Sequence, residues 1–230
     1  MNLAVIPARG GSKRIPGKNI RDFLGRPAIA YSIAAAQESG VFDRIIVSTD
    51  SPEVTAVARE LGAEVPFVRP AELSDDHTPT IPVIAHAIDW QESTGATVDF
   101  ACCIYATAPF VQAADLRSGL ERLRADPSLE FAFPITTFPF PIFRALSVED
   151  GVVRMFYPEH VSTRSQDLPE AWHDAGQFYW GTANAWRTSR GIFTSRAAGI
   201  PLPRCRVQDL DTLEDWKRAE LLFQLQQTSD

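Results

Sequence analysis

The segment Ala4–Asn19 constrains this chain more than any other, because it begins as a short apolar strand and continues into a loop of glycine and positive charge. The first 26 residues carry six basic side chains and one acidic one, Asp22, whereas the whole chain of 230 residues has a net charge of −7. Gly10 and Gly11 permit positive φ and close approach of backbone N–H groups, and Arg9 and Lys18 can add charge-assisted hydrogen bonds. We therefore expect a bound polyanion at the carboxyl end of the first strand.

Two familiar phosphate-binding motifs do not describe this loop. The P-loop has four residues between its glycines, followed by Lys and then Ser or Thr. Here five residues separate Gly11 from Gly17, and Asn19 stands where the hydroxyl residue should be. The dinucleotide fingerprint G-x-G-x-x-G is also absent. The loop is either a third kind of phosphate cradle or a solvated basic turn after an edge strand.

The first half of the chain alternates strand-like and helix-like segments. Repeated βα units predict an α/β fold with three layers around a mostly parallel sheet, whose ligands lie at the carboxyl ends of the strands. The pattern predicts strands at 3–6, 44–48, 64–68, 100–105, 131–136, 177–180 and 204–210. It predicts helices at 27–39, from Ser51–Pro52 to Gly62, at 81–91 with Thr80 as cap, at 113–124, and at 213–226 with Thr212 and Asp215 as a capping box.

This rhythm stops near Phe138, in a segment rich in aromatic residues and proline. We expect a single domain over residues 1–230, with an excursion at about 138–170 that forms an arm of short antiparallel strands. Isolated two-stranded arms are marginally stable, and exposed apolar surface of this kind usually has a partner. The alternative is a loop that folds back onto its own domain.

Asp209 and Asp211 flank one residue just before the last predicted helix. Two acids at this spacing can face the same side of an extended segment, and paired carboxylates suit Mg²⁺, or Mn²⁺, together with substrate phosphates. In the alternative reading, Asp211 only favours the helix N-terminus and Asp209 is a turn residue.

Composition excludes several classes of function. The acidic balance argues against nucleic acid as a partner, and no apolar run approaches the ~18 residues of a membrane span. The chain starts directly with a strand, so we expect no signal peptide. The three cysteines are odd in number, and Cys102 and Cys103 are adjacent in an apolar strand. A disulfide framework is therefore not expected, which fits a cytoplasmic location.

The pattern Ile6-Pro-Ala-Arg-Gly-Gly-Ser-Lys-x-x-x-x-Lys18-Asn19 resembles the signature of the sugar-acid cytidylyltransferases, the CMP-sialic acid synthetase family. The resemblance covers most of the chain and implies a Rossmann-like nucleotide-diphospho-sugar transferase fold, CTP and a nine-carbon sugar acid as substrates, and a homodimer formed through the arm. It implies a metal at Asp209 and Asp211, and catalytic roles for Arg9, Lys18 and Asp211. The nucleotide-binding residues that it implies are Pro7, Ala8, Arg9, Gly10, Gly11, Ser12, Lys18, Asn19, Arg69 and Thr80.

The substrate branch depends on the second half of the chain. Relatives that use sialic acid commonly have Gln-Pro-Thr-Ser-Pro where this chain has Tyr105-Ala-Thr-Ala-Pro109, while Gly176-Gln-Phe-Tyr-Trp180 resembles the branch that activates pseudaminic acid. The resemblance implies sugar contacts from Tyr105, Thr107, Arg164, Gln177 and Tyr179.

The expected reaction is transfer of CMP from CTP to the anomeric hydroxyl of the sugar acid, with release of pyrophosphate. Sialic acid and the eight-carbon acid Kdo are alternative substrates. A CTP-binding sensor without turnover is the alternative outside enzymes, and a retaining glycosyltransferase with an Asp-x-Asp metal site is the alternative enzyme. The sequence identifies no general base.

Overall fold

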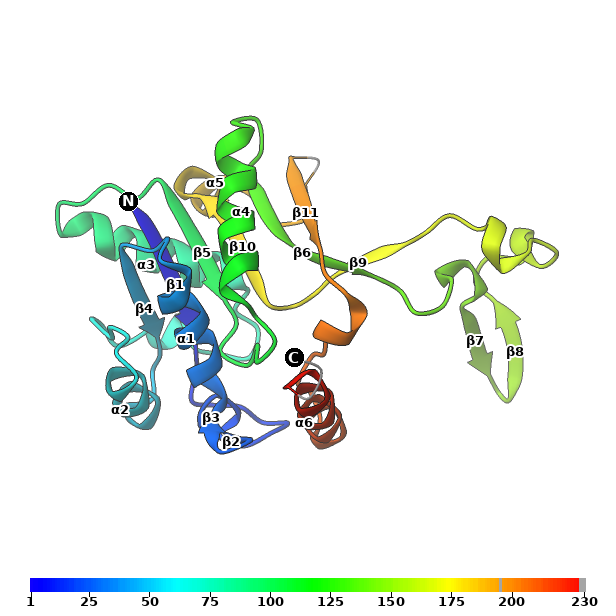
Figure 1. The fold of residues 1–230 in the computed structure, drawn as a ribbon, viewed down its shortest axis with the longest axis horizontal. Coiled ribbons are helices and arrows are strands. Elements are labelled where there is room, and N and C mark those ends of the chain that lie inside the picture. The colour runs from blue at the N-terminus through cyan, green and yellow to red at the C-terminus, as the bar shows by residue number, and fades with distance from the viewer. Residues whose placement is uncertain (195, 228–230) are drawn as a thin grey trace.

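A twisted, mostly parallel sheet forms the centre of the protein, for which a computed structural model describes residues 1–194 and 196–227 (Figure 1). Its strands lie in the order β11–β6–β10–β5–β1–β4, with β9 paired to β6. Strands β4 and β5 pair in parallel with β1, and β11 pairs in parallel with β6, whereas β10 runs antiparallel between β5 and β6. The strands are β1 (Asn2–Pro7), β4 (Arg44–Ser48), β5 (Phe100–Ile104), β6 (Phe131–Thr137), β9 (Trp172–Asp174), β10 (Phe178–Thr182) and β11 (Ala197–Pro201).

Helices cover both faces of this sheet, because its central strands are apolar on both sides. Along β1, Ala4 and Ile6 enter one buried cluster and Leu3 and Val5 enter the other. Helices α1, α2 and α4 pack on the first side, and α3 and α5 on the second. The helices are α1 (Ala28–Ser39), α2 (Pro52–Glu60), α3 (Thr80–Ser93), α4 (Ala113–Ala125), α5 (Ala183–Thr188) and α6 (Leu213–Gln227). The predicted three-layer α/β class is thus confirmed.

The C-terminal helix α6 packs on the segment that follows the basic loop. A small hairpin of β2 (Asp22–Phe23) and β3 (Arg26–Pro27) carries Phe23, which contacts Trp216 and Phe223 edge to face. The predicted capping box is present, since Thr212 N–H donates to Asp215 at 2.9 Å and Asp215 N–H donates to the Thr212 hydroxyl at 3.1 Å. This packing places the C-terminal helix against residues that follow the basic loop near the start of the sequence.

Three predicted elements differ in the structure. Residues 64–68 form only an isolated bridge between Glu64 and Ile46, because Pro66 has no N–H to continue a ladder. Residues 204–210 are not a strand: they begin as a 3₁₀ helix, Arg204–Arg206, and β11 precedes them. Thr80 is the first residue of α3 and not its cap, since Pro79 holds the cap position and no side chain bonds there.

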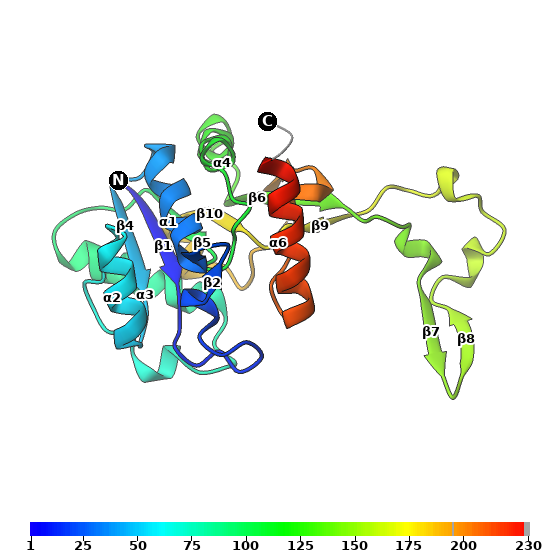
Figure 2. The same ribbon diagram turned by 60° about the horizontal axis from the view of Figure 1, so that its bottom comes forward.

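The predicted arm projects away from the sheet in both views (Figures 1 and 2). It spans residues 138–171, and its base is closed by a hydrogen bond of 3.1 Å from Phe138 N–H to Ala171 O. It contains one antiparallel hairpin, β7 (Leu146–Glu149) with β8 (Val152–Met155). Val148 and Val153 lie opposite each other in this hairpin and are 68% and 58% exposed.

Among the residues that the structure describes, no helix has both the length and the apolar character needed for a membrane span.

Candidate functional site

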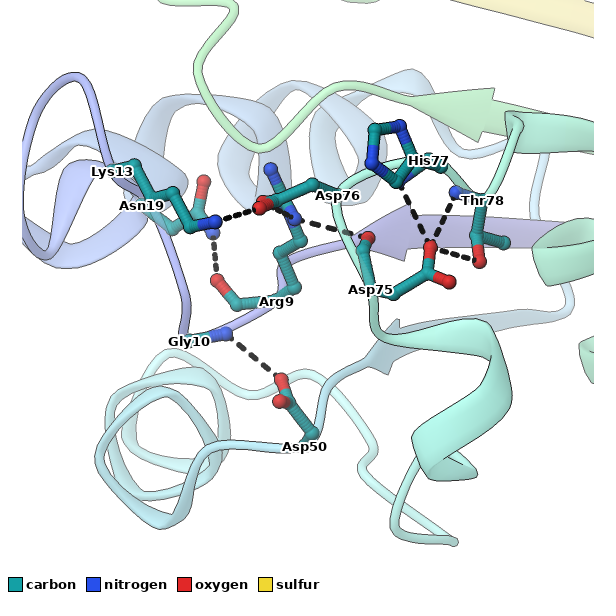
Figure 3. Close-up of polar contacts among 9 residues, drawn as sticks. All are labelled: Arg9, Gly10, Lys13, Asn19, Asp50, Asp75, Asp76, His77 and Thr78. Carbon is teal, nitrogen blue, oxygen red and sulfur yellow. Dashed lines mark hydrogen bonds and ion pairs between the residues drawn. The ribbon is translucent and has the colours of Figure 1, made fainter.

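The basic loop after β1 is held in place by local contacts. Asn19 is buried and its side-chain amide donates to Arg9 O at 2.9 Å, and Gly17 has a φ of +63° at the start of a short 3₁₀ helix, Lys18–Ile20. Gly10 N–H donates to Asp50 at 2.8 Å (Figure 3). A Cβ on Gly10 would lie 3.0 Å from the Ser51 side chain, which explains why glycine fits here.

The expectation about these glycines needs a correction. Neither Gly10 nor Gly11 adopts positive φ, and Gly17 does so instead. The Gly10 N–H donates to the Asp50 carboxylate. This loop amide can therefore bind an anionic oxygen, and within the protein Asp50 supplies that oxygen.

Asp76 connects the cations of the loop to the segment after residue 70. Arg9 and Lys13 both form ion pairs with its carboxylate, and Arg9 also donates to Asp75 O at 3.0 Å (Figure 3). Lys13 and then Arg9 lower the pKa of Asp76. Without any ligand, these cations therefore bind the carboxylate oxygens of Asp76, in the region where the sequence predicts a bound phosphate.

Asp75 stabilises the turn that presents Asp76. Its carboxylate accepts hydrogen bonds from the backbone N–H groups of His77 at 2.9 Å and Thr78 at 2.6 Å, and from the Thr78 hydroxyl at 2.7 Å (Figure 3). The Thr78 hydroxyl, followed by the two amides, lowers the pKa of Asp75. Asp75 thus stabilises the turn, and Asp76 forms ion pairs with the basic loop.

Lys18 connects the basic loop to the Asp209–Asp211 segment, almost the full chain length away. Its ammonium group donates to Leu210 O at 2.7 Å and lies 3.7 Å from an oxygen of Asp211. Arg14 approaches the other oxygen of Asp211 to 2.8 Å. The structure therefore brings together the two segments that the sequence picks out for phosphate and metal.

Asp209 and Asp211 have the chemistry of a divalent-cation site. Surrounding protein desolvates Asp209, although its side chain reaches the surface, and this together with the nearby charge of Asp211 raises the pKa of Asp209. The surroundings of Asp209 disfavour its negative charge, and a bound cation would stabilise that charge. No group of three or more metal-binding side chains occurs in residues 1–194 and 196–227, but Mg²⁺ needs only one or two carboxylates when substrate phosphates complete the shell.

A cavity of about 280 Å³ lies between the basic loop, the 69–80 segment and the end of β5. Of the residues predicted to bind the nucleotide, Ala8, Gly10 and Gly11 are outside its lining. Those on its wall are Pro7, Arg9, Ser12, Lys18, Asn19, Arg69 and Thr80. Basic and polar groups thus dominate one side of the cavity.

Arg69 is part of this wall although it is only 5% exposed. Its guanidinium donates to the Ser48 hydroxyl at 3.0 Å and to Ser48 O. Burial lowers the pKa of Arg69 to about 10, which leaves the group cationic at neutral pH. The fixed guanidinium can therefore offer directed donors to a polar ligand.

The residues predicted to contact the sugar are only partly brought together. Tyr105 and Thr107 line the cavity, and Tyr179 packs behind Tyr105 with ring centroids 5.4 Å apart. Gln177 is 3% exposed and its amide N–H donates to Arg206 O at 2.6 Å, while its amide oxygen has no hydrogen-bond partner among the residues that the structure describes. Arg164 lies in the arm, paired with Asp167 at 2.7 Å, away from the cavity of its own chain.

Three acidic residues at this site are absent from the predicted set. Asp50 binds the loop amide, Asp76 pairs with the loop cations, and Asp174 accepts a hydrogen bond from Tyr179. Asp50 and Asp76 follow β4 and the segment after it, at the sheet edge where ligands bind, and this position was an available signal. Nothing in the local sequence marks Asp174.

Comparisons with known proteins agree with this geometry. The family model "Cytidylyltransferase" matches residues 3–223. A pseudaminic acid cytidylyltransferase of Campylobacter jejuni is 44% identical over 99% of this chain and 98% of its own length. A CMP-N,N'-diacetyllegionaminic acid synthase of Legionella pneumophila is 30% identical over 98% of this chain and 97% of its own. Among solved structures, CMP:2-keto-3-deoxy-manno-octonic acid synthetase with CTP shares the fold, with a TM-score of 0.71, 17% identity and coverage of 98% and 99%. The chain belongs to the cytidylyltransferase family.

Proposed function

We propose that this protein transfers CMP from CTP to the anomeric hydroxyl of pseudaminic acid and releases pyrophosphate. The observation that carries the proposal is the convergence of Lys18, from the basic loop, with Asp211, from the other end of the chain, beside a cavity lined by cations. The 44% identity to a pseudaminic acid cytidylyltransferase over nearly both full lengths supports this sugar over the legionaminic acid of the more distant relative.

The chain's own residues supply charge and position. Arg9 and Lys18 bind the triphosphate, Asn19 positions the nucleotide by holding the loop backbone at Arg9, and Arg69 with Thr80 contacts the cytosine. The anomeric hydroxyl oxygen attacks the α-phosphorus and loses its proton to water, the bond from that phosphorus to the oxygen bridging to the β-phosphate breaks, and pyrophosphate leaves with the electron pair. Transfers of this kind depend on positioning and charge neutralisation more than on covalent chemistry.

Asp209 and Asp211 would hold Mg²⁺, or Mn²⁺. Such an ion, when bound, neutralises phosphate charge and polarises oxygen ligands. In the protein alone, Arg14 and Lys18 balance Asp211, and both side chains also line the cavity. They are therefore placed to turn to a triphosphate when a cation takes over the carboxylates.

A second copy of the chain completes the proposed enzyme. The arm exposes an apolar hairpin face and carries Arg164 away from its own cavity. In a homodimer, the arm would be covered and Arg164 could serve the site of the partner, where its charge would offset the repulsion between a sugar carboxylate and a triphosphate.

Pyrophosphate release with CTP and a panel of sugar acids tests the proposal. We expect the highest kcat/KM with pseudaminic acid and lower values with legionaminic acid, N-acetylneuraminic acid and Kdo. If another acid is preferred, the substrate is wrong while the chemistry stands. If CTP binds but no acid yields pyrophosphate, the protein is a CTP-binding sensor instead.

A further inference from the structure

The chain between β11 and α6 carries Asp209 and Asp211 without regular secondary structure around them (Figure 1). It begins with the 3₁₀ turn Arg204–Arg206, and residues 207–211 form neither helix nor strand. The capping box of α6 fixes the far end of this segment, and the buried side chain of Leu210 fixes its middle. The contacts at the near end therefore decide how the segment enters the site.

Arg206 holds this near end through both its side chain and its backbone. Its guanidinium forms an ion pair with Asp115, in the first turn of α4, and also donates to Phe110 O at 3.5 Å. Its carbonyl oxygen accepts a hydrogen bond of 2.6 Å from the side-chain amide of Gln177. The turn is thus attached to a helix that covers the sheet and to the residue that precedes β10.

Gln177 connects this turn to the cavity wall. The backbone carbonyl of Gln177 accepts a hydrogen bond of 2.9 Å from the N–H of Tyr105, and Tyr105 lines the cavity. Arg206 is not part of the cavity lining. It can therefore influence the site through the backbone that it holds, and not by touching a ligand there.

The ion pair of Arg206 and Asp115 is largely removed from water, because the two side chains are only 15% and 13% exposed. The Nε atom of Arg206 is buried and has no hydrogen-bond partner among residues 1–194 and 196–227. Buried ion pairs often add less stability than apolar side chains of the same volume, and an unpaired buried donor adds a further cost. Stability alone is therefore a poor reason for this pair, whereas its two charges specify which groups meet.

We propose that Asp115 and Arg206 are positioning residues, which hold the start of residues 207–211 so that Asp209 and Asp211 are placed to bind a divalent cation. This inference rests on the proposed function, which assigns Mg²⁺ or Mn²⁺ to these two acids. Groups that orient metal ligands contribute to metal affinity although they do not touch the ion. CTP binding in the absence of metal should not depend on Asp115 or Arg206.

Isothermal titration calorimetry with CTP tests this inference when each protein is titrated once in EDTA and once in saturating Mg²⁺. The Kd in EDTA divided by the Kd in Mg²⁺ measures the coupling between metal and nucleotide. R206Q and D115N should each lower this ratio about tenfold, as expected for groups that orient metal ligands, and leave the Kd in EDTA unchanged. The double variant D115N/R206Q should be no worse than R206Q, since both changes break the same ion pair.

The two single variants separate position from long-range electrostatics. R206Q removes a positive charge and D115N removes a negative one, so an effect of charge alone would have opposite signs in the two variants. Loss of position lowers the ratio in both. R44Q is the matched control, because Arg44 also forms an ion pair, with Glu64, but lies at the start of β4 and outside the cavity lining. It should leave both Kd values unchanged.

The inference is overturned if R206Q and D115N leave the ratio unchanged, if they shift it in opposite directions, or if R44Q lowers it equally. Thermal melting identifies any variant that fails to fold. In that case R206K and D115E, which keep both charges but displace them, should lower the ratio severalfold, and an unchanged ratio in both refutes the inference.

Two results with the wild-type protein are distinct from these. A CTP affinity that does not respond to Mg²⁺ would refute the metal site and this inference with it. Release of no pyrophosphate with any sugar acid would refute the proposed function itself, whatever the calorimetry of the variants shows.

Discussion

Lys18 is the residue where the two halves of the proposed site meet. It is the loop cation that contacts both Leu210 O and Asp211, whereas Lys13 on the same loop is 80% exposed along its side chain and pairs with Asp76. A cation fixed by such contacts can stabilise a developing charge without reorganising, while a mobile surface cation cannot.

We therefore expect Lys18→Ala to reduce kcat/KM about 100-fold or more, as removal of a preorganised contact to a reacting group does. Lys13→Ala is the matched control, and its kcat/KM should fall severalfold at most. Pyrophosphate release measures both, and circular dichroism checks the fold. Equal losses in the two variants would mean that Lys18 has no special position.

Asp76 pairs with Arg9, one of the two cations that we propose bind the triphosphate, and with the neighbouring Lys13. Like charges cannot share these cations without cost, so CTP must displace the carboxylate before it binds. Asp76→Asn removes the competing charge and should tighten CTP binding severalfold in isothermal titration calorimetry, with a larger gain at low salt. Asp167→Asn, which changes an acid paired within the arm, is the control. Weaker binding by the Asp76 variant would show that Asp76 instead prepares the loop for phosphate.

The ion pairs of Asp76 could not be predicted from the sequence. Its partners lie more than 60 residues away, and only the order of strands in the sheet brings them together. The roles of the loop cations and of the acids at 209 and 211 could be proposed from the sequence, because basic residues favour phosphate and paired carboxylates favour a divalent cation. Which acid neutralises which base depends on tertiary packing, which the sequence does not display.

At the scale of elements, the predictions succeed where burial decides and fail where backbone hydrogen bonds decide. The apolar run of β1 is sufficient to predict a strand buried on both faces, and the pattern of α1 is sufficient to predict a helix buried on one side. Residues 64–68 look equally strand-like, but Pro66 cannot donate to a ladder. Residues 204–210 also alternate, yet β11 already pairs with the free edge of β6.

Asp211 lies just before helix α6, which begins at Leu213, so the cap of this helix matters to the site. Thr212→Ala removes the hydroxyl that bonds Asp215 and should lower stability by about 1 kcal/mol, or ~2–4 °C in Tm. Glu214→Ala, in the same first turn but exposed, is the control and should change Tm little. Differential scanning fluorimetry measures both. An unchanged Tm for Thr212→Ala would mean that packing of Trp216 and Phe223 alone holds the helix.

For the molecule as a whole, contacts within one chain do not explain how the arm keeps its structure. Residues 138–171 leave the body and expose large apolar side chains to solvent. A two-stranded hairpin of this size is marginally stable alone. We therefore expect the arm to be ordered by a second copy of the chain, which covers the face formed by Leu146, Val148, Val153 and Met155.

Val148→Glu places a charge at the centre of that face and should convert the proposed dimer to a monomer in light scattering, because an unpaired charge is costly to bury. Arg154→Glu changes charge on the opposite face of the same hairpin and should leave the dimer intact. If the partner also receives Arg164, the monomer should lose activity with the sugar acid while its affinity for CTP stays near wild type. A fully active monomer would restrict Arg164 to its contact with Asp167, and a dimer unaffected by Val148→Glu would place the interface elsewhere.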